Sequence, residues 1–215
     1  GRKRGILKRT GKTSMRRGKA HVLAIMGGLG LGLLLYYVVV GPSSRREISI
    51  RDVAQAREMF NKFERFEVKF SNKKEVVGVV RSIVENLGPN AALKILSSDH
   101  MKILKPEIRV WILRSVLDGL HKRTTNYLKR LQRPEGLLKK LGSELAENTK
   151  DVIERLSKLS REFTALKEVK DEKKLYNGVK KLAESLGRID EELFKSLSSI
   201  EETSKYLEKA LEQMR

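Results

Sequence analysis

Cysteine is absent from this sequence of 215 residues, and proline and aromatic residues are scarce. Without cysteine the chain has no disulfides, no thiolate nucleophile and no cysteine-ligated zinc or iron–sulfur site. Only four prolines interrupt a chain that is rich in Leu, Lys and Glu, a composition typical of helical proteins. We therefore expect an all-α fold.

Signatures of catalysis are also missing. The three histidines, His21, His100 and His121, share no predicted helical face with each other or with a suitable acid, and we expect His100 and His121 to face solvent. No zinc-binding helix motif, paired carboxylates on an apolar face or nucleophile elbow occurs. The sequence thus predicts no catalytic residue, no cofactor and no metal ligand. We expect a protein that is not an enzyme.

The net charge of +19 is distributed unevenly. Residues 1–20 contain nine Lys or Arg and no acid, and residues 45–133 contain twenty basic and ten acidic side chains. Residues 134–215 contain seventeen of each. A polyanion or an anionic lipid surface is therefore expected to face the first two-thirds of the chain.

Residues 22–40 form a run of nineteen residues without a charged side chain. As a helix this run would cover about 28 Å, close to the thickness of a bilayer's hydrocarbon core. Gly41 and Pro42 are expected to end it. The pattern predicts one transmembrane helix, residues 21–41. The alternatives are a buried core helix and a cleavable signal peptide, although the run is long for the latter and no typical cleavage site follows.

The flanking charges predict an orientation. The cation-rich segment before the run places the N-terminus on the cytoplasmic, matrix or virion-interior side of a membrane, which the sequence does not identify. Within the run, Ala24, Gly28 and Gly32 lie four residues apart. Small residues at this spacing allow two membrane helices to pack closely, although glycine is also common in membrane helices in general.

Residues 1–20 have the composition of a flexible basic tail, because they contain no apolar periodicity. Such a tail can contact anionic lipid or nucleic acid, or it can serve only to set the membrane orientation. The candidate contact residues are Arg2, Lys3, Arg4, Lys8, Arg9, Lys12, Arg16, Arg17 and Lys19.

Residues 45–133 are predicted to form a basic helical domain. Apolar residues at three- and four-residue spacing indicate helices over about 48–66, 72–87, 90–96 and 106–133. Four phenylalanines are expected in its core: Phe60, Phe63, Phe66 and Phe70. The last predicted helix ends in five cations that suit either the helix dipole or an acidic partner: Lys122, Arg123, Lys129, Arg130 and Arg133.

Residues 134–215 are predicted to form a coiled-coil arm, because apolar residues recur every seven positions. The first row is Leu138, Leu145, Val152, Leu159 and Leu166, and the second is Val179, Leu186, Leu193, Ile200 and Leu207. The two rows are out of register and are separated by a polar stretch, 170–174. The pattern favours two helices, about 135–168 and 172–214, as an antiparallel hairpin or as one bent helix.

Long apolar rows bury little surface without a partner, so we expect a homo-oligomer or a subunit of a larger complex. The leading hypothesis is a membrane-anchored structural scaffold that assembles through its coiled-coil arm. Its setting would be a virion with an internal membrane, or a membrane complex in which it is an accessory subunit. The alternative is a membrane tether that binds nucleic acid or ribosomes through the basic tail and the basic helical domain.

Overall fold

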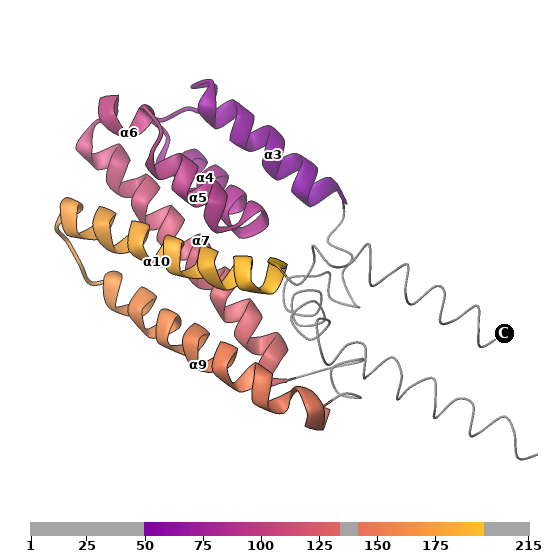
Figure 1. Ribbon diagram of the computed structural model, residues 1–215. Coiled ribbons are helices and arrows are strands. Elements are labelled where there is room, and N and C mark those ends of the chain that lie inside the picture. The colour runs from indigo at the N-terminus through magenta and orange to yellow at the C-terminus, as the bar shows by residue number, and fades with distance from the viewer. Residues whose placement is uncertain (1–49, 134–141, 196–215) are drawn as a thin grey trace, which may run out of the picture. The chain divides into compact units, whose positions relative to one another are not determined.

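The computed structural model describes residues 50–133 and 142–195, and every element in these ranges is an α-helix (Figure 1). The all-α prediction is therefore confirmed for them. The helices are α3 (Ile50–Glu64), α4 (Lys73–Leu87), α5 (Pro89–Leu96), α6 (His100–Ile103), α7 (Pro106–Gln132), α9 (Gly142–Leu166) and α10 (Glu172–Lys195).

The corner between α4 and α5 follows from local sequence signals. The Asn72 side chain accepts a hydrogen bond from the Glu75 backbone N–H and so caps the start of α4. Gly88 ends α4 with φ +85°, a value that L side chains rarely adopt. Pro89 then occupies the first turn of α5, where its missing N–H breaks no helical hydrogen bond.

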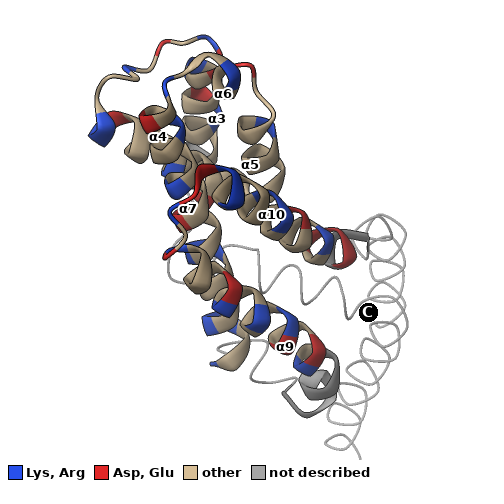
Figure 2. Cartoon of the chain, turned by 90° about the vertical axis from the view of Figure 1, so that its left-hand side faces the viewer, with Lys and Arg blue, Asp and Glu red and all other residues tan. Residues whose placement is uncertain are grey.

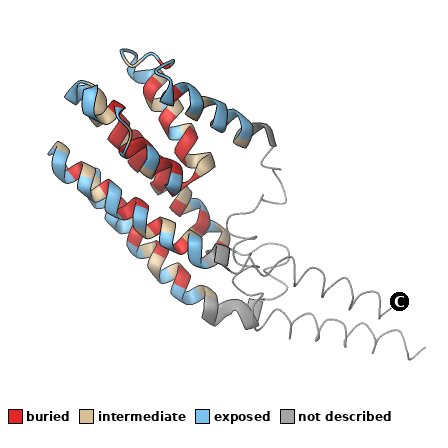
Figure 3. Ribbon diagram, turned by 45° about the horizontal axis from the view of Figure 1, so that its top comes forward, coloured by how far each residue is buried: buried red, intermediate tan, exposed pale blue. Residues whose placement is uncertain are grey.

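The longest described helix, α7, has 27 residues and is central to the fold. It packs against α4, α5 and α9, while α3 covers α4. Buried residues line the sides of the helices that face one another (Figure 3). The core of α7 includes Ile112, Leu113, Val116 and Leu120, which are all completely buried.

Helices α9 and α10 lie along α7 in opposite directions. His121 of α7 contacts Ser160, whereas Arg114, two turns earlier in α7, contacts the later residue Lys167, so α9 is antiparallel to α7. Arg109, near the start of α7, pairs with Glu172 at the start of α10, and Arg123 acts on Asp190 further along. Helix α10 is therefore parallel to α7 and antiparallel to α9.

The turn between α9 and α10 is attached to α7 through arginines. Arg114 donates hydrogen bonds to the carbonyl oxygens of Lys167 (3.1 Å) and Val169 (2.9 Å). Arg109 Nε and Nη2 donate to the two carboxylate oxygens of Glu172. These contacts fix the start of α10 against the first turns of α7.

The described residues of the apolar rows predicted for the coiled-coil arm pack in the interior of this helical bundle. Among the residues whose side chains are described, Val152, Leu159, Val179 and Leu186 are buried, and Leu166 is half-buried. The described helices as far as Glu191 form one compact unit. The rows of α9 and α10 thus complete a core to which α7 also contributes.

The localisation prediction requires correction. No helix in the ranges 50–133 and 142–195 has both the length and the apolar character that a bilayer crossing needs. This finding contradicts the predicted single-pass membrane localisation, with its N-terminus on the cytoplasmic, matrix or virion-interior side, and that localisation is not retained. The run 22–40 that suggested it lies outside the described residues.

Candidate functional site

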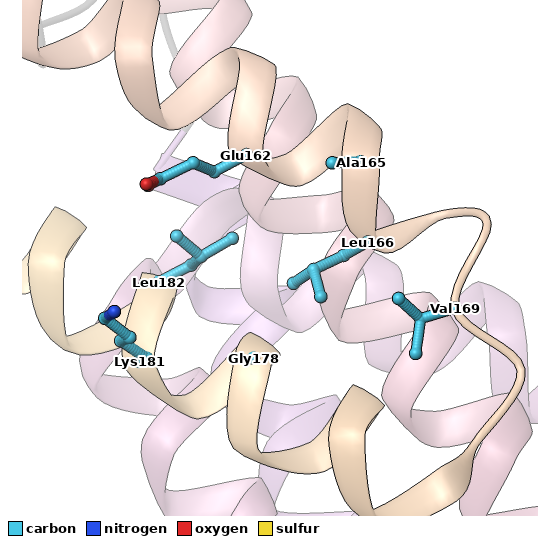
Figure 4. Close-up of a pocket in the computed structure, with 7 residues that line it drawn as sticks. All are labelled: Glu162, Ala165, Leu166, Val169, Gly178, Lys181 and Leu182. Atoms are coloured by element: carbon cyan, nitrogen blue, oxygen red, sulfur yellow. The ribbon is translucent and has the colours of Figure 1, made fainter.

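An open groove lies between α9 and α10, next to the turn that joins them (Figure 4). It has a volume of about 270 Å³. Its lining residues are Glu162, Ala165, Leu166, Val169, Gly178, Lys181 and Leu182. Five of the seven are apolar or glycine, so the groove suits an aliphatic side chain.

Gly178 allows the two helices to approach at the groove. A Cβ atom at this position would lie 2.5 Å from Leu166 Cδ2. The contact brings Leu166 against the backbone of α10. Glu162 and Lys181 are exposed and supply the only charges of the lining.

A second candidate site is a polar cluster where α10 meets α7 and the corner between α4 and α5. Arg123 donates a hydrogen bond to the Glu85 carbonyl oxygen (2.9 Å), and its Cζ lies 5.3 Å from the centroid of the Tyr127 ring. Its guanidinium lies against Gly88, where a Cβ atom would be 3.1 Å from Cζ. The side chain thus joins α7 to the end of α4 and to the corner that follows it.

Asp190 of α10 faces this cluster. Its Oδ1 is buried without a hydrogen-bond partner, as is Arg123 Nε. Burial raises the pKa of Asp190 to about 6, although the positive charge of Arg123 and the nearby Tyr127 hydroxyl oppose the rise. Asp190 is therefore a partly buried acid whose pKa, about 6, lies well above its ordinary value.

The basic end of α7 is less available to a partner than its sequence suggests. Lys122 pairs with Glu85 at 3.2 Å, and Arg123 belongs to the polar cluster. Burial lowers the pKa of Arg130, and the charge of Arg123 contributes to the decrease. Of the five predicted cations, Lys129 and Arg133 are the exposed ones that form no ion pair within the described residues.

Two histidines differ from the prediction that they face solvent. His100 is only 5% exposed. Its ring packs against Phe63, Phe66 and Phe70, with centroid separations of 5.1, 3.7 and 5.9 Å. His121 is half-buried, stacks on Phe163 at 5.9 Å and lies 3.3 Å from the Ser160 hydroxyl. Burial and the nearby Lys167 lower the pKa of His121.

The predicted phenylalanine core is only partly correct. Phe63 is completely buried, but Phe66 is 44% exposed and has a backbone φ of +59°. This region of backbone space is rare for a bulky residue. Phe66 covers the buried His100 from outside, at the turn that follows α3.

Several predicted site residues lie outside the described residues. They are the helix-packing residues Ala24, Gly28 and Gly32, the nine cations of residues 1–20, and Leu138, Ile200 and Leu207 of the apolar rows. The backbones of Leu145 and Leu193 belong to α9 and α10, but their side chains are not described.

No pattern in the sequence indicated the Asp190 cluster. Its members lie far apart in the chain, and Asp190 follows Ile189 on a helix that looks like an ordinary amphipathic one. Only the register of α10 against α7 brings Asp190 to Arg123. The sequence contains a weak indication of the groove, because Gly178 interrupts a segment whose composition otherwise favours a helix.

In comparisons with known proteins, no family model, no curated protein and no solved structure matches the chain. Within the described residues, no three His, Cys, Asp or Glu side chains lie close enough together to hold a metal ion. The groove, the polar cluster and the surface charge are therefore the features that bear on function.

Proposed function

We propose that this protein is a non-enzymatic helical scaffold, which assembles with protein partners through helix–helix contacts. The observation that carries the proposal is the open, largely apolar groove between α9 and α10. Apolar surface that remains open on a helix pair favours the binding of a further helix.

The organisation of α9 and α10 supports a coiled-coil role. The two helices are antiparallel, and each has an apolar row with a seven-residue period. We propose that they form the base of a coiled-coil hairpin, whose inner side packs on α7 and whose outer side accepts a partner. The settings proposed for such a scaffold are a virion or the accessory subunit of a large complex.

The polar groups also suit a structural protein. Arg109, Arg114 and Arg123 use their nitrogens to join helices that are distant in the sequence. Such contacts fix the register of the bundle. Side chains committed in this way are not free for substrate chemistry.

Photo-crosslinking tests the scaffold proposal. A photoreactive amino acid replaces Lys181 at the rim of the groove, or Arg57 on α3 as the control, in the full chain. Both positions are exposed. We expect position 181 to crosslink to protein in an extract of the source organism, and position 57 to crosslink much less. Equal, background-level yields from the two positions would contradict the proposal.

A second candidate function is binding to nucleic acid, and the charge of α3–α7 favours it. Acidic residues are interspersed among the cations on these helices (Figure 2), but cations are in excess between residues 45 and 133. The exposed Lys73, Lys94 and Lys129 form no ion pair within the described residues. Binding to duplex DNA that weakens steeply from 50 to 200 mM salt would support this function, and affinity that is insensitive to salt would exclude it.

A further inference from the structure

We propose that the groove between α9 and α10 binds residues 196–214 of a second copy of this chain. The inference depends on the proposed scaffold function and names the partner.

The apolar character of the two surfaces matches. The groove is lined by Ala165, Leu166, Val169 and Leu182 and has room for a leucine-sized side chain. In residues 196–214, Ile200, Leu207 and Met214 recur at intervals of seven. A helix with that row would present one aliphatic side chain at a time to the groove, as a knob fits a hole.

The charges are complementary as well. Lys181 lines the groove, and Lys158 and Lys174 lie one helical turn from the lining residues Glu162 and Gly178. All three lysines are exposed. Arg161 and Glu184 lie at the same spacing from Ala165 and Lys181 and are also exposed, so four cations and two acids surround the groove. Residues 196–214 contain four Glu and two Lys. A segment with a net negative charge is favoured at a rim with a net positive charge.

The direction of α10 favours a second copy over the same chain. At 1.5 Å per residue, Glu191, the last residue of the compact unit, lies about 14 Å further along α10 than the groove residue Leu182. The chain therefore leaves α10 well away from its own groove. To fill that groove, residues 196–214 would have to reverse and run back along α10, whereas a neighbouring copy needs no reversal.

Such a contact joins two different surfaces, the groove of one copy and residues 196–214 of the next. Contacts of this kind are heterologous, so they form rings or open chains of subunits and not only dimers. A scaffold built in this way would grow by addition of identical copies.

Sedimentation velocity of the full chain tests the inference over a range of concentrations. The groove variant is Ala165→Glu, an exposed position where a new acid enters the apolar lining. The tail variant is Leu207→Glu. The control is Ala54→Glu, the same substitution at an exposed position of α3. We expect wild type and control to associate, and each test variant to weaken association at least about tenfold.

Mixing the two variants makes the test specific. The groove variant retains an intact tail and the tail variant an intact groove, so an equimolar mixture is expected to form a heterodimer. A wild-type chain that stays monomeric overturns the inference, as does a groove variant that associates like the control, or a mixture that does not pair.

Cysteine crosslinking provides a measurement that does not depend on a disruptive substitution. The native chain has no cysteine, so in a mixture of Lys181→Cys and Glu208→Cys chains the disulfide between positions 181 and 208 identifies the heterodimer, apart from the 181–181 and 208–208 homodimers. We expect this heterodimer to form faster than one between Arg57→Cys and Glu208→Cys, and equal rates overturn the inference. If position 181 crosslinks only to a different protein, the self-assembly inference fails while the scaffold function stands.

Discussion

Gly119 of α7 lies so close to Val84 of α4 that a Cβ atom at position 119 would be 2.9 Å from both Cβ and Cγ1 of Val84. Val84 is completely buried, and its branched side chain has little rotational freedom. Gly119 therefore sets the distance between the two helices at the centre of the core.

The first prediction concerns this contact. Gly119→Ala is expected to lower the free energy of unfolding by about 1–3 kcal/mol, because overpacking outweighs the gain in helix propensity. The control is Gly78→Ala on α4, where no atom lies within 4 Å of the added Cβ; it is expected to stabilise by up to about 1 kcal/mol. Urea denaturation measures both, and a Gly119→Ala variant as stable as wild type would contradict the described packing.

The second prediction concerns Asp190 and pH. Burial raises the pKa of this acid to about 6 in the folded protein, above its unfolded value of about 3.9. The folded state thus holds the proton more tightly, and the stabilisation from the protonated acid is lost as the pH rises from about 4 through about 6. The loss amounts to roughly 3 kcal/mol at most.

Asp190→Asn removes this dependence. We expect the variant to be more stable than wild type at pH 7.5 and of similar stability at pH 4.5, as measured by urea denaturation. Glu184→Gln, at an exposed position of the same helix, is the control and is expected to match wild type at both values. A stability difference between Asp190→Asn and wild type that does not vary with pH would contradict the burial of Asp190.

The third prediction concerns His121. Burial lowers its pKa first, and the positive charge of Lys167 lowers it further. Lys167→Gln should therefore raise the pKa of His121, which an NMR titration of the imidazole protons measures directly. The backbone carbonyl of Lys167 that Arg114 binds is unaffected. Lys150→Gln, an exposed site near the other end of α9, serves as the control, and equal shifts in the two variants would contradict the proximity of Lys167.

The fourth prediction concerns the turn between α9 and α10. Arg114→Ala removes the donors to the carbonyl oxygens of Lys167 and Val169. We expect a loss of about 1–3 kcal/mol in the free energy of unfolding and faster amide exchange in the first turn of α10. Arg114→Lys, which retains the charge without the forked geometry, should recover only part of the loss. Full recovery by lysine would show that charge alone matters there.

Most helix positions could be predicted from the sequence, because their signals are local. The helix expected over 72–87 is observed as Lys73–Leu87, with Gly88 and Pro89 at its end, and the one expected over 106–133 is observed as Pro106–Gln132. Caps, proline and the spacing of apolar residues act within a few residues of where they occur. The break near residue 170 was predictable for the same reason, since α9 ends at Leu166 and α10 begins at Glu172.

The burial of polar residues could not be predicted in this way. His100 is covered by three phenylalanines, and Asp190 lies beside Arg123. Neither burial is indicated by the residues next to His100 or Asp190 in the sequence. The predicted solvent exposure of His100 was wrong because a short helix, α6, turns its ring inward at the end of α3. Similarly, two of the five cations at the end of α7, Arg123 and Arg130, are partly buried.

The sequence by itself determined which segments become helices and which face of each is apolar, since both depend on interactions between residues three to seven positions apart. Only the tertiary structure decided which helix each apolar face packs against. The apolar rows of α9 and α10 pack into one core with α7. They do so because the arginines of α7 fix the turn between α9 and α10, and because Gly178 lets Leu166 lie against α10. The same register leaves one apolar groove open at the surface, and no local pattern carries that information.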